Sequence, residues 1–100
     1  MTKDVLVLSA VRSAVGTFNG SLASLEPADL AGRVMKEAIA RSGVDAQAIN
    51  YVTVGNCIPT ESRFAYVARV ASIQAGLPME SVAMAVNRLC SSGLQAVVST

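Results

Sequence analysis

Two cysteines are the residues of this chain whose type and setting point to chemistry, because a cysteine thiolate is a strong nucleophile. Cys90 stands in "NRLCSSGLQA", directly after an apolar, strand-like run and directly before a helix-like run. Its neighbours Ser91, Ser92 and Gly93 are small and leave room for a substrate to reach the sulfur. This setting predicts a nucleophile that attacks a carbonyl carbon.

The predicted position of Cys90 is the first turn of a helix. Backbone N–H groups there have no intrahelical acceptor, and the positive end of the helix dipole favours a thiolate over a thiol. The same N–H groups are suited to hold the oxyanion that forms when the sulfur attacks. The dipole contributes only roughly 0.3–1 kcal/mol, so efficient acyl transfer also needs a base, most often histidine. The chain contains no histidine, and we expect the base to come from elsewhere.

A buried, inert thiol is the alternative interpretation of Cys90, since cysteine is among the most buried residue types. For Cys57, in "VGNCIPT", we favour this structural interpretation, because the residue lies at a strand's end and does not open a helix. Two cysteines make no disulfide framework, and their spacing matches no zinc pattern. We therefore expect reduced thiols, a cytoplasmic location and no metal site.

Composition and charge exclude several classes of partner. The chain has 100 residues, 52% of them hydrophobic, with eight basic and seven acidic residues and a net charge of +1. This balance gives no polybasic surface, so we expect neither nucleic acid nor a membrane as partner. The chain's start fits a secretory signal badly, and no apolar run approaches membrane-spanning length.

Three strand-like segments alternate with three helix-like segments along the chain. We expect strands at residues 5–11, 49–58 and 81–86, and helices at residues 27–43, at 63–78 and from Cys90 onward. This alternation predicts an α/β fold with a largely parallel sheet. Because unbroken apolar strands need cover on both faces, we expect these residues to be part of a larger fold.

The helix expected at residues 27–43 has the clearest pattern. Pro27 fits a first turn, and Gly43 is a typical C-terminal stop. Its apolar side chains form one stripe of two adjacent rows: Leu30, Val34 and Ala38, with Ala31, Met35 and Ile39. In the next helix Ala68, Ala71 and Ala75 form a small face, which predicts the close approach of a neighbouring element.

With these segments in place, the chain resembles the thiolases, the family of acetyl-CoA acetyltransferases and β-ketothiolases. "NRLCSSGLQA" resembles the family's nucleophile motif, and "SAVRSAVGTFNGSL" resembles its N-terminal segment. "PADLAGRVMKEAIARSGV" resembles its first helix, and "VTVGNCIPTES" resembles the strand and loop that follow. The match covers residues 1–100 and implies a portion of the thiolase N-terminal domain, with the remainder of the fold outside this chain.

The resemblance implies an acyl-CoA C-acyltransferase in which Cys90 takes the acyl group from acyl-CoA. The acyl-enzyme then condenses with acetyl-CoA to a 3-ketoacyl-CoA, or the reverse thiolytic cleavage occurs. The substrates are coenzyme A thioesters of fatty acid metabolism, no cofactor is implied, and the family forms homo-oligomers, dimers or tetramers. The family's histidine, asparagine and second cysteine belong to later motifs without a counterpart here, so the 100 residues alone are expected to be inactive.

The stretches around "NRLCSSG" and "GNCIPTE" look closer to bacterial broad-range β-ketothiolases than to strictly acetoacetyl forms. Two other functions stay open. A ketoacyl synthase shares the fold but takes its acyl group from a carrier protein, and "NRL" and "GLQA" favour the thiolase. A non-catalytic thiolase-like domain would hold acyl chains without turnover.

Four arginines carry the charge that could contact coenzyme A phosphates: Arg12, Arg63, Arg69 and Arg88. Solvated surface positions or structural ion pairs are the favoured interpretation for all four. The sequence therefore identifies no residue that binds coenzyme A, and Cys90 is the one catalytic residue that it predicts.

Overall fold

The computed structural model describes residues 2–100. At its centre two parallel strands, β1 (Tyr51–Gly55) and β2 (Val82–Val86), pair with Tyr51 opposite Val82 and Gly55 opposite Val86. The helical elements are α1 (Pro27–Ser42), η1 (Ala46–Ala48), η2 (Ser62–Tyr66), α2 (Val67–Gln74) and α3 (Ser92–Ser99). This order confirms the predicted α/β fold with parallel strands.

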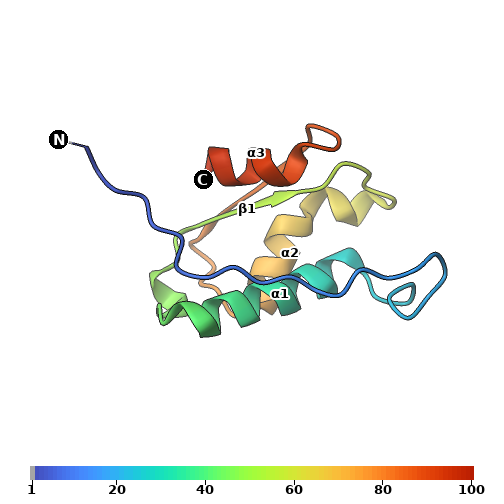
Figure 1. Cartoon of the computed structure of the whole chain (residues 1–100), viewed down its shortest axis with the longest axis horizontal. Coiled ribbons are helices and arrows are strands. Elements are labelled where there is room, and N and C mark those ends of the chain that lie inside the picture. The colour runs from blue at the N-terminus through green and yellow to red at the C-terminus, as the bar shows by residue number, and fades with distance from the viewer. Residues whose placement is uncertain (1) are drawn as a thin grey trace.

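The helices lie on both sides of the strands. Figure 1 shows α3 on one side of β1, and α2 with α1 on the other. Two parallel strands need a crossover connection, and the short elements η2 and α2 form it here. Within residues 2–100, no helix combines the length and the apolar character that a membrane span requires.

Helix α1 follows the sequence prediction closely. It begins at Pro27 and ends at Ser42, and Gly43 has a φ of 73° in the left-handed region that suits a C-terminal glycine. The predicted apolar stripe is half-buried, while the charged side chains Arg33, Lys36 and Glu37 are exposed. The stripe therefore faces the rest of the chain, as its spacing predicts.

Small residues let α1 and α2 approach closely. Ala71 is 0% exposed, and a Cβ atom added at Gly32 would lie 3.2 Å from the Gln74 Cβ and 3.4 Å from the Ala71 carbonyl oxygen. The Gln74 side-chain amide also donates to an Asp29 carboxylate oxygen at 2.8 Å. The predicted small face of the second helix is thus confirmed. The α-helix begins later than predicted, because Ser62–Tyr66 form the 3-10 helix η2, and it ends at Gln74, just before Gly76, whose φ is 89°.

The strand predicted at residues 5–11 is wrong. No strand is formed there, and Val5 and Val7 are 93% and 83% exposed. The Ser9 hydroxyl donates to the Ala38 carbonyl at 2.8 Å, so the segment runs beside α1 (Figure 1). A strand requires a neighbour that completes its hydrogen-bond ladder, and within the described part of the chain β1 pairs only with β2. The apolar residues of this segment predict that it tends to be buried, but they do not identify a strand with which it could pair.

The buried contact at Ala71 generates a prediction on stability. In Ala71→Leu, a larger side chain enters a site that α1 already fills, and overpacking of this kind costs about 1–3 kcal/mol. Thermal unfolding of the complete protein, followed by circular dichroism, should show a lower midpoint. Val70→Leu is the matched control, because Val70 lies on the same helix with 37% of its surface exposed. An equal midpoint for both variants would contradict the close approach of α1 and α2.

Candidate active site

The loops that follow β1 and β2 meet at one edge of the sheet. Because the strands are parallel, their carboxyl ends, Gly55 and Val86, lie side by side. The Asn56 amide donates to the Val86 carbonyl at 3.0 Å, and the Asn87 side-chain amide donates to the Cys57 carbonyl at 3.1 Å. Hydrogen bonds therefore join the loop that carries Cys57 to the loop that leads toward Cys90.

Cys90 lies in a tight turn between β2 and α3. The Ser91 amide donates to the Arg88 carbonyl and the Ser92 amide donates to the Leu89 carbonyl, both at 3.1 Å. Leu89 has a φ of 52°, a left-handed conformation that costs a residue with a side chain on the order of 1–3 kcal/mol. The residue directly before the predicted nucleophile is thus held in a strained backbone conformation.

Two side chains stabilise this strained turn. The Asn87 Oδ1 atom accepts a hydrogen bond from the Leu89 amide at 2.9 Å. The Ser92 hydroxyl accepts from the Arg88 amide at 2.9 Å and donates to the Leu89 carbonyl at 2.7 Å. Ser92 is 4% exposed, so its bonds are shielded from water. The sequence analysis missed both roles, although asparagine and serine are residue types that commonly bond to nearby backbone in turns.

The end of the turn packs against Gly55, the last residue of β1. A Cβ atom at Gly55 would lie 2.5 Å from the Ser92 carbonyl carbon and 2.7 Å from the Gly93 amide nitrogen. Only glycine permits two backbones to approach this closely. The absence of a side chain is required at Gly55 and not at Gly93. Among residues 2–100, a Cβ atom at Gly93 would meet nothing within 4 Å apart from its chain neighbours and the backbone of α3 itself.

Cys90 is exposed and free, which agrees with a nucleophile and not with the buried alternative. Its predicted place in the first turn of the helix is wrong by two residues, since α3 begins at Ser92 with Ser91 as its N-cap residue. The reason is the turn itself, whose amides bond back to preceding carbonyls before the helix starts. The first-turn amides of Gly93 and Leu94 follow Cys90 in the chain and have no intrahelical acceptor.

Cys57 is also exposed and free, so the structural role that the sequence predicted for a packed thiol is wrong. The stretch of residues 57–63 that follows β1 is exposed throughout. At this position the backbone makes the contact, since the Cys57 carbonyl accepts the side-chain amide of Asn87. A strand's end indicated burial, but the chain leaves the sheet just before this residue.

Each of the four arginines considered as phosphate contacts has a hydrogen-bond partner within the chain. The carboxylates of Glu26 and Glu61 raise the pKa of the Arg63 guanidinium above its ordinary value. Arg69 donates to the Ser81 carbonyl at 2.6 Å. Arg88 donates to the Gln95 side chain, and Arg12 donates to the Ser13 carbonyl. These contacts support the predicted structural interpretation.

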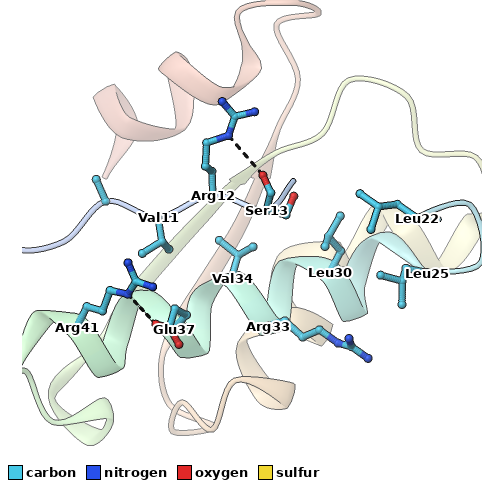
Figure 2. A pocket seen from close by; sticks show the side chains of 11 residues that line it. Val11, Arg12, Ser13, Leu22, Leu25, Leu30, Arg33, Val34, Glu37 and Arg41 are labelled. Atoms are coloured by element: carbon cyan, nitrogen blue, oxygen red, sulfur yellow. Dashed lines mark hydrogen bonds and ion pairs between the residues drawn. The ribbon is translucent and has the colours of Figure 1, made fainter. Parts of the chain in front are cut away.

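A cavity of about 680 Å³ has neither cysteine among its lining residues. It lies between the N-terminal segment and α1, where Val11, Leu30 and Val34 line it and an ion pair of Arg41 and Glu37 lies beside them (Figure 2). In the part of the chain that the structure covers, no three side chains of the metal-ligating types gather. At the sheet edge the fold therefore presents two exposed thiols, Cys57 and Cys90, and Cys90 is the one that follows the left-handed residue Leu89.

Comparison with known proteins agrees with this geometry. Residues 5–100 match the family described as "Thiolase, N-terminal domain". The chain is 48% identical over 99 residues to the beta-ketothiolase BktB of Cupriavidus necator, with 99% of this chain and 25% of that protein covered. It is 42% identical over 97 residues to an acetyl-CoA acetyltransferase of Syntrophomonas wolfei, with 97% and 24% covered. The chain thus spans about a quarter of the length of the curated relatives it matches.

Solved structures give the same result. The Acat5 thiolase of Ascaris suum, solved in complex with coenzyme A, superposes with a TM-score of 0.92 at 38% identity, over 97% of this chain and 25% of that one. The acetyl-CoA acetyltransferase of Bacillus anthracis superposes with a TM-score of 0.87 at 40% identity, over 93% and 23%. The parallel α/β fold and the hydrogen-bonded turn at Cys90 agree with these matches. The chain therefore belongs to the thiolase family, and its residues 5–100 correspond to the family's N-terminal domain.

Proposed function

We propose that the protein to which these residues belong is an acyl-CoA C-acyltransferase that forms an acyl-enzyme on Cys90. The observation that carries the proposal is an exposed, free sulfur on a strained and hydrogen-bonded turn in a chain of the thiolase family. A nucleophile needs access for its substrate and a fixed position. The turn between β2 and α3 supplies the fixed position, and exposure supplies the access.

The proposed reaction has two steps. The Cys90 thiolate attacks the thioester carbonyl of an acyl-CoA, the bond between the carbonyl carbon and the coenzyme A sulfur breaks, and the coenzyme A thiolate leaves. The enolate of acetyl-CoA then attacks the new thioester, a carbon–carbon bond forms, and the Cys90 thiolate is released with a 3-ketoacyl-CoA. In the cleavage direction the same bonds form and break in reverse.

A general base is required for both steps, because a proton leaves the thiol and another leaves the α-carbon of acetyl-CoA. The 100 residues contain no histidine. We therefore propose that residues outside this chain supply the base, and that Cys90 and its turn contribute the nucleophile alone.

The substrate class rests on the relatives. The proteins matched at high identity are named beta-ketothiolase and acetyl-CoA acetyltransferase, and the Ascaris suum thiolase was solved with coenzyme A. These names support coenzyme A thioesters over acyl groups on a carrier protein, which a ketoacyl synthase would use. Fatty acid metabolism, the cytoplasmic location and the homo-oligomer, a dimer or tetramer, stay predictions.

The polarity of α3 supports the proposal that these residues are one part of a larger domain. The side of α3 that faces the strands carries the buried Ser92 and Ala96. The opposite side carries Leu94, Val97 and Val98, which are between 71% and 73% exposed. A helix at a protein surface normally places its apolar side toward the core, so we expect the outer side of α3 to be covered in the complete protein.

Removal of the Cys90 sulfur tests the nucleophile. In the complete protein we expect Cys90→Ala to lower kcat for thiolysis of a 3-ketoacyl-CoA by about a thousandfold or more, because no acyl-enzyme can form. Steady-state assays that follow loss of the ketoacyl-CoA enolate absorbance give the rate. Cys57→Ala is the matched control and should keep its rate within about twofold of the wild type. Wild-type turnover by Cys90→Ala would refute the assignment of Cys90 as the nucleophile.

A second prediction concerns the 100 residues by themselves. A purified protein of this sequence alone should show no thiolysis, because it has a nucleophile but no histidine to act as base. The same assay with the complete protein is the positive control. Measurable cleavage by the 100 residues alone would show that the base lies within this chain.

The exposed apolar side of α3 generates a third prediction. The 100 residues alone should bind a hydrophobic dye such as ANS more strongly than the complete protein does, per mole, because Leu94, Val97 and Val98 are then in water. Replacing all three by glutamine should lower dye binding in the short form. A short form that unfolds cooperatively as a monomer and binds no dye would contradict the proposal of a larger domain.

A further inference from the structure

We propose that Gly55 and Ser92 are positioning residues that together fix the place of the Cys90 sulfur above the sheet edge. The proposal rests on the proposed function, since position matters only if Cys90 reacts with a bound substrate. Neither residue touches the sulfur through a contact that the structure describes. Both act on the turn that carries it.

Gly55 sets the distance between the turn and the sheet. A Cβ atom at this position would lie 2.5 Å and 2.6 Å from the carbonyl carbon and oxygen of Ser92, and 2.7 Å from the Gly93 nitrogen. All three atoms belong to backbone, which cannot rotate away as the end of a flexible side chain can. Any side chain at Gly55 therefore has to move the first turn of α3 away from β1, and Cys90 lies two residues before that turn.

Ser92 sets the shape of the turn. Its hydroxyl joins the Arg88 amide at 2.9 Å to the Leu89 carbonyl at 2.7 Å, and Leu89 has a φ of 52°. The Ser92 hydroxyl thus binds one backbone group before Leu89 and the carbonyl of Leu89 itself, and Leu89 is the residue with the unfavourable backbone conformation. Without it, Leu89 can relax toward negative φ, and this rotation would swing Cys90, the next residue in the chain.

The expected consequence is specific to catalysis. Displacement of a reacting group by about 1 Å costs on the order of a hundredfold in rate. Reaction with a small reagent in solution needs no such alignment with a bound substrate, because Cys90 is exposed. Loss of position should therefore lower turnover and leave alkylation of Cys90 nearly unchanged.

Ser92→Ala and Ser81→Ala form a matched pair for the test. Ser81 is 2% exposed and its hydroxyl donates to the Ile49 carbonyl at 2.6 Å, at the start of β2 and far along the sheet from the turn. Both substitutions remove a buried hydroxyl that bonds to a carbonyl. In the complete protein, we measure kcat and KM for thiolysis, the rate of Cys90 alkylation by iodoacetamide, and the thermal midpoint.

We expect Ser92→Ala to lower kcat about tenfold to a hundredfold, with KM and the alkylation rate within about threefold of the wild type. Ser81→Ala should lower the thermal midpoint while kcat stays within about twofold of the wild type. Gly55→Ala is the second variant and should also lower kcat more than tenfold with little change in alkylation.

Several results would overturn the inference. Equal kcat for Ser92→Ala and Ser81→Ala, with wild-type kcat in Gly55→Ala, would show that the turn does not need these residues for its position. If Ser92→Ala and Gly55→Ala both fail to fold while Ser81→Ala folds, the contact serves folding and not positioning. A complete wild-type protein without thiolysis would instead remove the proposed function itself, and this inference with it.

Discussion

The approach of two backbones, at the carboxyl end of β1 and the start of α3, is the contact on which the candidate site depends. Gly55 lies against the peptide that joins Ser92 to Gly93, at a distance that leaves no space for a Cβ atom. Parallel pairing of β1 with β2 brings the loop that carries Cys90 to this same edge. A glycine in a strand usually weakens it, so its use here is explained by the neighbour that it admits.

Strain and its compensation explain the turn at Cys90. A left-handed conformation at Leu89 costs on the order of 1–3 kcal/mol, and each hydrogen bond within the protein contributes about 1 kcal/mol net. The Asn87 side chain makes one such bond and the Ser92 hydroxyl makes two, so the two terms are of similar size. The bonds therefore offset the cost of the left-handed conformation at the residue directly before Cys90.

The distribution of apolar surface supports the proposal that these residues are one part of a larger domain. The small-residue contact between α1 and α2 is buried around Ala71, whereas the outer side of α3 and the segment from Val5 to Leu8 are exposed. Both exposed regions are rich in β-branched residues and leucine, whose burial contributes roughly 1.5–3 kcal/mol per side chain. The chain spans about a quarter of the length of its curated relatives, which is consistent with surfaces that other residues cover.

The sequence by itself determined the α/β class, the bounds of α1 and the small face at Ala71, and its motif predicts Cys90 rather than the other cysteine as the nucleophile. These follow from local periodicity, from helix-end residues and from a motif, all of which act over a few neighbouring positions. Only the tertiary structure decided that residues 5–11 form no strand, that α3 begins at Ser92, and that the close approach occurs at Gly55. Each of these depends on which segment lies opposite in space, because hydrogen-bond ladders, shared turns and steric limits are made by pairs of distant residues.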